Sequence, residues 1–231
     1  MAFKQKGSSK KVYIAIVLLV VLIAASAAVI YASQPPAAKT NVGVHVGDTF
    51  TYSLMGISNL TSLDAVDTPG FSQYNNTDYY KITITNVNGT SVSLDTLWTF
   101  KNATSITGKQ TIDLSNGNKT ETNGFWAIYA SNLNVGDKLR PTGFDGVTVN
   151  ATDTITYLNS TRTRNYMSVG GESYLATDPT HSTLRYDTTI VYFDKQTGML
   201  ETLIWITDYN NPEMREVITW NIVGSSVWAV Q

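Results

Sequence analysis

The sequence predicts an all-β protein: an N-terminal transmembrane helix followed by an antiparallel sandwich, or by a strongly curved half-barrel-like sheet with at most one or two short helices. Three observations predict this fold class. Residues 12–32 form one uncharged apolar run. After residue 41, apolar and polar residues alternate with period two in several segments. Short turns, two of which contain Asn-Gly, join these segments, and eight to ten strands result.

The first element is the apolar run at residues 12–32, in which Ser26 is the one clearly polar residue. At about 1.5 Å per residue a helix of this length spans roughly 30 Å, the thickness of a bilayer's hydrocarbon core. Four lysines and no acidic residue lie within residues 1–11, and positive flanks stay in the cytoplasm. We therefore expect a cytoplasmic basic segment at 1–11 and a transmembrane helix, or uncleaved signal anchor, in contact with membrane lipid at 12–32.

Two other interpretations of the N-terminus remain open. Ala25-Ser26-Ala27 resembles the cleavage site of a secretory signal peptide, although the apolar run is longer than the usual 7–15 residues of such a signal. Lys6-Gly7 resembles the processing point of a pilin-type signal, but Lys10 and Lys11 would then precede the apolar helix. The length of the run favours the anchor over the cleaved signal peptide, and the two lysines favour it over the pilin-type signal.

The next elements are a linker and one large domain. Residues 33–40 form a Pro/Ala linker that favours an extended conformation. Residues 41–231 form the expected extracellular antiparallel β domain. We therefore place the protein in the cell membrane as a single-pass protein with a cytoplasmic N-terminus and an extracellular bulk.

Alternation predicts the strands of this domain in chain order. The expected strands are 49–54, 80–84, 92–100, 110–114, 147–157, 184–193, 199–209, 214–223 and a short one at 227–230. Asn88-Gly89 predicts a tight hairpin, because both residues tolerate positive φ. Gly198 closes a five-residue hairpin loop at 194–198. The spacing of apolar residues in 125–133 fits a short helix, and a buried strand fits nearly as well.

Composition excludes several classes of function. The chain has no cysteine, which excludes disulfides, thiolate metal sites and a cysteine nucleophile. His45 and His181 pair with no nucleophile at a recognisable spacing, and no nucleophile elbow, phosphate loop or dinucleotide fingerprint occurs. The formal net charge of −2 argues against a nucleic-acid partner. We expect no enzymatic activity, no cofactor and no bound metal.

Seven Asn-x-Ser/Thr sequons make the domain a candidate for N-glycosylation. They are Asn59, Asn75, Asn88, Asn102, Asn118, Asn150 and Asn159. All seven follow the apolar run, on the side that we place outside the cell. The alternative is that a surface rich in Thr and Asn produces sequons by composition alone, since the chain contains 32 Thr and 18 Asn.

Aromatic residues mark a possible ligand or interface face. The candidates are Trp98, Phe125, Trp126, Tyr129, Trp205 and Trp220. The strand 199–209 has large apolar side chains on both faces, so one face meets the core and the other meets a second layer, a partner or a ligand. Arg162 and Arg164 share a face and form either a basic spot for a carboxylate or sugar acid, or cross-strand ion pairs.

Three short motifs carry a resemblance: the segment 46–52 (VGDTFTY), the stretch 125–137 ending in Asn-x-Val-Gly-Asp, and the late segment 192–200 (YFDKQTGML). In these the chain resembles a loose group of uncharacterised archaeal single-pass cell-surface β proteins. The resemblance implies an anchored extracellular β domain on a cell that glycosylates its surface, and it implies no activity.

We expect a membrane-anchored, N-glycosylated cell-surface protein with a non-catalytic structural or interaction role. Its expected partners are membrane lipid at 12–32 and envelope proteins or glycans. The sequence leaves its oligomeric state open. The alternative function is an extracellular binding module that holds an apolar or lipid-like ligand between a curved sheet and the segment 125–133.

Overall fold

The computed structural model describes residues 40–60, 67–68, 70–120, 126–158, 160–174, 180 and 182–230. The chain divides into two compact units, 1–38 and 39–231, and all described residues belong to the second. The basic segment at 1–11, the apolar run at 12–32 and all of the linker except Thr40 lie outside the described residues. Among the helices of the described part, none is long and apolar enough to cross a bilayer.

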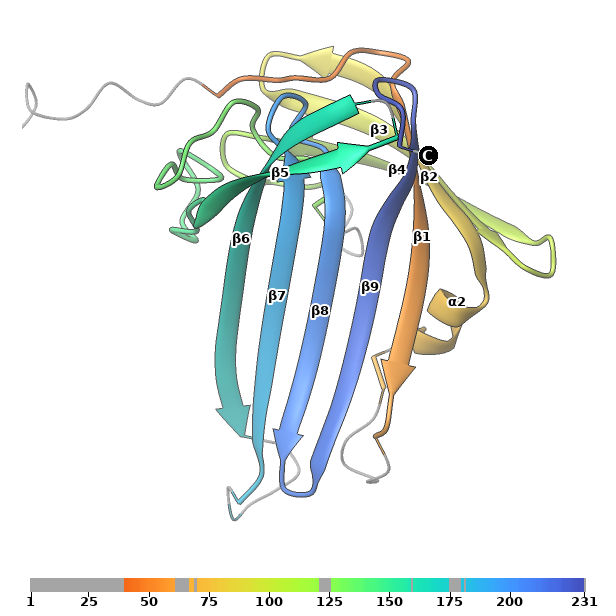
Figure 1. Cartoon of the computed structure of the whole chain (residues 1–231), viewed down its shortest axis with the longest axis vertical. Coiled ribbons are helices and arrows are strands. Elements are labelled where there is room, and N and C mark those ends of the chain that lie inside the picture. Colours follow the sequence, from red (N-terminus) through yellow and green to blue (C-terminus); the bar gives the residue numbers. More distant parts are fainter. Residues whose placement is uncertain are drawn as a thin grey trace, which may run out of the picture. The chain divides into compact units, whose positions relative to one another are not determined.

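Within the described residues, nine antiparallel strands form one sheet, in the order β4-β3-β2-β1-β9-β8-β7-β6-β5 (Figure 1). The strands are β1 (Thr49–Ser58), β2 (Thr77–Asn88), β3 (Ser91–Phe100), β4 (Ser105–Asp113), β5 (Ala151–Tyr157), β6 (Ser160–Tyr174), β7 (Leu184–Asp194), β8 (Leu200–Asn210) and β9 (Glu213–Ser225). One short helix, α2 (Phe71–Asn75), precedes β2. The predicted all-β class and the strand count are confirmed.

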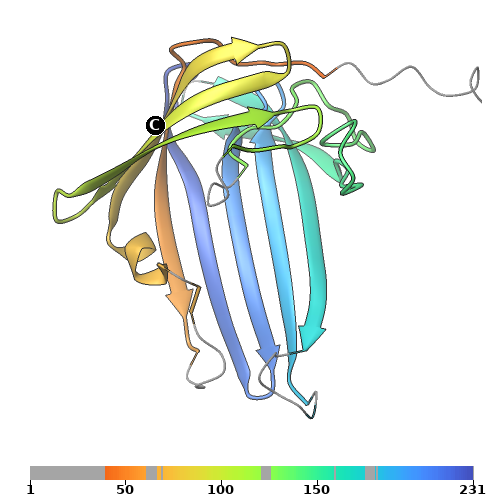
Figure 2. The same cartoon turned by 180° about the vertical axis from the view of Figure 1, so that it is seen from behind.

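The sheet is open, and it bends strongly along its length. Figures 1 and 2 show β2, β3 and β4 curling across one end of the long strands β6 to β9. Register shifts in β1, β2 and β7 accompany the bending, as bulges increase local twist. Because the nine strands belong to one sheet, the described residues do not form a two-sheet sandwich.

The core lies on one face of the sheet, which we call the inner face. On β1 this face carries Phe50, Tyr52 and Leu54, in alternation with more exposed residues. The loop segment 126–149 covers part of this face and contributes buried side chains of its own, including Ile128, Tyr129, Leu133, Leu139 and Val149. The opposite face is called the outer face below.

The short helix considered for residues 125–133 is not present in the described part, 126–133. Ile128 instead forms an isolated antiparallel bridge with Met199. The Tyr129 amide donates to the Gly198 carbonyl (2.9 Å), and the Leu200 amide donates to the Ala127 carbonyl (2.9 Å). These backbone partners lie in the β7–β8 turn and at the first residue of β8. They pair backbone N–H and C=O groups of the segment, so the segment needs no helical hydrogen bonds.

Three other elements differ from the prediction. The alternation of 147–157 begins as a strand only at Ala151, and the expected strand 227–230 is irregular, with Trp228 buried. The sequence pattern does not predict β6, because this strand is polar and its last six residues are exposed. Backbone pairing with β7, from Arg164 to Tyr174, defines it instead.

The two Val-Gly-Asp motifs form the same turn. The Asp48 carboxylate accepts a hydrogen bond from the His45 amide, and that of Asp137 accepts one from the Asn134 amide, each at 2.7 Å. Both turns place their glycine at positive φ, 97° at Gly47 and 89° at Gly136. The repeated motif therefore encodes a repeated local turn.

Candidate functional site

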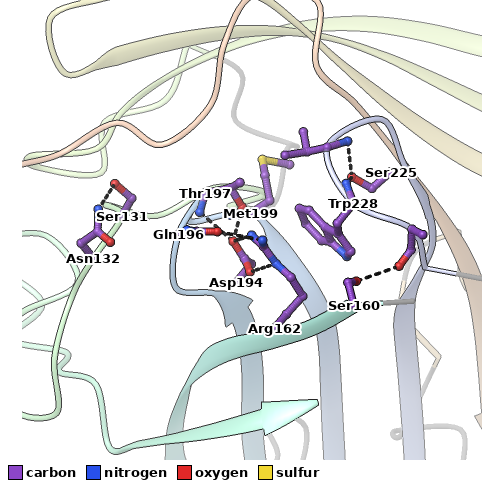
Figure 3. Close-up of polar contacts among 12 residues, drawn as sticks. Ser131, Asn132, Ser160, Arg162, Asp194, Gln196, Thr197, Met199, Ser225 and Trp228 are labelled. Atoms are coloured by element: carbon purple, nitrogen blue, oxygen red, sulfur yellow. Dashed lines mark hydrogen bonds and ion pairs between the residues drawn. The ribbon is translucent and has the colours of Figure 1, made fainter. Parts of the chain in front are cut away.

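An ion pair links β6 to the end of β7 at one end of the sheet (Figure 3). The Arg162 guanidinium donates to both oxygens of Asp194, from Nε at 2.9 Å and from Nη2 at 2.8 Å. The Asp194 side chain is 0% exposed and that of Arg162 is 15% exposed. Such a bidentate pair fixes the plane of the guanidinium.

Asp194 also shapes the turn that joins β7 to β8. Its Oδ1 accepts hydrogen bonds from the Thr197 amide (2.7 Å) and hydroxyl (2.8 Å). The Trp228 ring, from the C-terminal segment, lies 4.8 Å from Arg162 Cζ. One buried carboxylate therefore joins β6 to the hairpin turn, and its arginine also contacts the C-terminal segment.

A hollow of about 240 Å³ lies beside this ion pair. Its lining residues are Asn132, Thr161, Arg162, Thr163, Asp194, Lys195 and Gln196. Arg162 Nη1 donates to Gln196 Oε1 (2.7 Å), and Lys195 Nζ donates to Asn134 Oδ1 (3.0 Å). Two cationic side chains and one carboxylate thus give the lining a formal charge of +1.

Arg164 belongs to a separate ion pair. Its Nε and Nη2 donate to the two oxygens of Asp153 on β5, at 2.7 and 3.0 Å. Its guanidinium also lies 4.2 Å from the centre of the Tyr192 ring. Both arginines are therefore in cross-strand ion pairs, one of the two arrangements that the sequence allowed.

Glu201, which the sequence did not indicate as special, has a buried carboxylate. Glu201 as a whole is 1% exposed. Burial raises the pKa of Glu201 to about 7, while the nearby Tyr157 hydroxyl, Arg164 and Arg162 oppose that rise. Burial and the Glu201 carboxylate together raise the pKa of Tyr157 well above its ordinary value. A register shift between β7 and β8 lies beside this residue.

Three of the predicted aromatic residues lie on the inner face. Trp98 and Trp220 both contact Tyr74 and Tyr80, and the rings of Tyr80 and Trp220 are 4.8 Å apart. Trp98 Nε1 donates to Thr77 Oγ1 at 2.7 Å. Trp205 is partly buried and packs against the same core. These rings contribute to the core, so their burial needs no ligand.

Trp126 and Tyr129 lie in the loop segment. The Trp126 ring contacts Lys119 Nζ at 4.1 Å and the Arg140 guanidinium at 4.2 Å. Tyr129 is buried against Phe193, at 4.8 Å between ring centres. Phe125 lies outside the described residues. The predicted aromatic face therefore consists of separate contacts, in the sheet and in the loop.

The second apolar face predicted for 199–209 is the outer face. Here Ile57 pairs with Val217, and Val217 pairs with Ile206. Together with Met55, Ile204 and Ile190 these side chains make up what we call the outer apolar rows. Met55 is 50% exposed and Ile57 is 61% exposed. The others are partly exposed, and none of the six belongs to the described core cluster or its partly buried neighbours.

A second and larger hollow, of about 480 Å³, lies on β2, β3 and β4. Its lining includes Lys81, Asp95, Leu97 and Lys109. Lys109 pairs with Asp95 at 3.7 Å, and the lysine side chain is 84% exposed. Because its lining residues are partly or fully exposed, this hollow is an open depression on the surface of the sheet.

Six sequon asparagines fall within the described residues, and all six are exposed: Asn59, Asn75, Asn88, Asn102, Asn118 and Asn150. Each lies in a turn or at the end of an element. In four of them Oδ1 accepts a backbone amide hydrogen bond: Asn59 from Arg215, Asn75 from Gly56, Asn102 from Thr104 and Asn150 from Ser168. Asn159 lies outside the described residues.

Comparison with known proteins gives no family for the chain: no protein-family model matches it, and no curated protein matches it. The resemblance to archaeal surface proteins therefore stays a prediction. Within the described residues, no group of three or more His, Asp or Glu side chains is placed to hold a metal ion.

Proposed function

We propose that the protein is a membrane-anchored, N-glycosylated cell-surface protein with a non-catalytic structural or interaction role. The observation that carries this proposal is the placement of the sequons. All six described sequon asparagines are exposed, in turns or at element ends, where a glycan adds bulk without disturbing the core.

The side-chain geometry at these positions supports the proposal. The Thr104 hydroxyl, the hydroxyl of the sequon itself, donates to Asn102 Oδ1 at 2.7 Å. This contact uses the amide oxygen of Asn102, and Nδ2 is the atom that a glycan would modify. The same oxygen-bound arrangement at Asn59, Asn75 and Asn150 orients three more sequons.

The outer apolar rows fit an interaction role, because partly exposed apolar surface commonly marks a contact surface. No sequon follows Asn159 in the sequence, so β7, β8 and β9 carry none. The alternative, an apolar ligand held between the sheet and the segment 125–133, lacks such support. Ile128, Tyr129 and Leu133 of that segment are themselves buried in the core.

The first experiment tests glycosylation. Protein purified from its native source is digested and analysed by mass spectrometry, and peptides containing Asn88, Asn102 and Asn118 are expected to carry a glycan mass. Asn116 and Asn132, which are not in sequons, serve as the internal control and should be unmodified. Unmodified asparagine at all of the sequons would overturn the glycosylation part of the proposal.

The second experiment tests the anchor. Membranes of the native cells are washed with high salt and then with alkaline carbonate, which removes peripheral proteins. The full-length chain is expected to stay in the membrane pellet until detergent is added, because a 21-residue apolar helix inserts essentially irreversibly. Recovery of the full-length chain in the soluble fraction would overturn the anchor.

A further inference from the structure

We propose that the hollow beside Arg162 is a binding site for the carboxylate of an acidic monosaccharide, such as a uronic acid. The hollow is lined by parts of three segments that are distant in sequence: Asn132 in the loop segment, residues 161–163 of β6 and residues 194–196 at the β7–β8 turn. This proposal rests on the lining residues and is independent of the proposed membrane anchor.

The lining is rich in hydrogen-bond donors, which favours an anionic ligand. A guanidinium has five N–H groups. Three of those on Arg162 bind Asp194 and Gln196, which leaves two. An ammonium has three, and one on Lys195 binds Asn134, which leaves two more. Because Asp194 is neutralised by Arg162, the charge that the lining offers to a ligand is that of Lys195.

Arg162 is held rigidly before any ligand binds. Its bidentate contact with Asp194, itself fixed by Thr197, sets the plane of the guanidinium. Trp228 packs on the guanidinium and limits its motion. A hydrogen-bond donor held in place in this way loses little conformational entropy when a ligand binds, which improves affinity for a small ligand.

Size and side-chain chemistry indicate a single sugar unit. The volume of about 240 Å³ is smaller than the roughly 300–1,000 Å³ of pockets for drug-sized ligands. Asn132 Nδ2 donates to Ser131 Oγ at 3.4 Å, and Gln196 Oε1 accepts from Arg162. Each side-chain amide has hydrogen-bonding capacity beyond that contact, which matches sugar hydroxyls. A carboxylate facing Lys195 and Arg162, with the ring against these amides, uses four of the seven lining residues.

The test is a titration of the full-length protein in detergent micelles, followed by NMR of side-chain amides and by calorimetry. Sodium glucuronate is expected to give saturable shifts of the Asn132 and Gln196 side-chain amides. Glucose and sodium acetate, at the same concentration and ionic strength, are expected to bind at least about tenfold more weakly, since each lacks one half of the contacts. Equal binding of glucuronate and acetate would overturn the sugar part, and no saturable binding would overturn the site.

Two variants assign the binding to this hollow. Lys195→Gln removes a charge at the rim without touching the buried pair, and it should weaken glucuronate binding about tenfold or more. Arg164→Gln removes the same charge two residues from Arg162, outside the lining, and should leave glucuronate affinity unchanged. Equal weakening by both variants would mean that glucuronate responds to overall charge, and would overturn the proposal.

Discussion

Gly198 lies directly against the carbonyl group of Tyr129: a Cβ added to Gly198 would be 2.0 Å from the Tyr129 oxygen. Gly198 has φ of 76°, and its carbonyl accepts the Tyr129 amide at 2.9 Å. This contact attaches the loop segment to the β7–β8 turn. Both the backbone conformation and the close approach require glycine at this position.

Gly198→Ala is therefore expected to destabilise the protein strongly. The left-handed conformation alone costs an alanine roughly 1–2 kcal/mol, and the clash with backbone should raise the total to about 3 kcal/mol or more. Gly47→Ala is the matched control, because Gly47 has φ of 97° and nothing within 4 Å of its added Cβ. Urea unfolding measures both variants, and equal losses would show that the Tyr129 contact has no energetic effect.

The hydrogen bond from Trp98 to Thr77 carries a second prediction. Thr77 is buried, accepts from Trp98 Nε1 at 2.7 Å and donates to the Gln73 carbonyl at 2.8 Å. Thr77→Val keeps the shape and leaves two polar groups unpaired, so we expect a loss of about 1–3 kcal/mol in the free energy of unfolding. The comparison uses unglycosylated protein, because this change also removes the sequon of Asn75. Thr83→Val, on the same strand but partly exposed, should stay within about 0.5 kcal/mol of wild type. Urea titration followed by tryptophan fluorescence compares the two, and equal effects would contradict the prediction.

The sequence pattern predicted eight of the nine strands. The contrast between faces is clearest on β1, where the buried Phe50, Tyr52 and Leu54 alternate with more exposed residues. The pattern failed where that contrast is missing. In β6 the residues Gly170 and Gly171 and their neighbours are exposed on both faces, so no period-two signal exists. At 227–230 the buried Trp228 resembles a strand residue, although it packs on Phe50 from an irregular segment.

The candidate site was less predictable than the strands. The spacing of Arg162 and Arg164 indicated a shared face, but their partners Asp194 and Asp153 follow from the register of β6 with its two neighbours, which local sequence does not specify. Glu201 lies beside a bulge that shifts the register between β7 and β8. Predicting the ion pairs or this bulge would need the exact register of neighbouring strands, which the local sequence pattern does not give.

The two arginine pairs should differ in their contribution to stability. Asp194→Asn leaves Arg162 without its buried counter-charge, so we expect a loss of about 3–5 kcal/mol. Asp153→Asn breaks a pair in which the aspartate side chain is 48% exposed, and the loss should be about 1 kcal/mol or less. Thermal and urea unfolding of the two variants give the comparison. Losses of similar size would mean that the burial of Asp194 does not strengthen its pair.

Glu201 makes stability depend on pH in a defined direction. Because burial raises its folded pKa to about 7, above the ordinary value of 4.5, the folded state binds the proton more tightly than the unfolded state does. The resulting stabilisation, about 3 kcal/mol at most, is complete below pH 4.5 and is lost as the pH rises through about 7. We therefore expect the free energy of unfolding to fall between pH 5 and pH 8 through this group.

Glu201→Gln tests this dependence, because the amide stays neutral throughout the range. Its unfolding free energy, measured in urea at intervals from pH 5 to pH 8, should change less with pH than that of wild type and should exceed it at pH 8. Glu172→Gln, at an exposed position on β6, is the control and should keep the wild-type slope. If Glu201→Gln also keeps the wild-type slope, then the Glu201 carboxylate is ionised in the folded protein and the neighbouring Arg162 and Arg164 outweigh its burial.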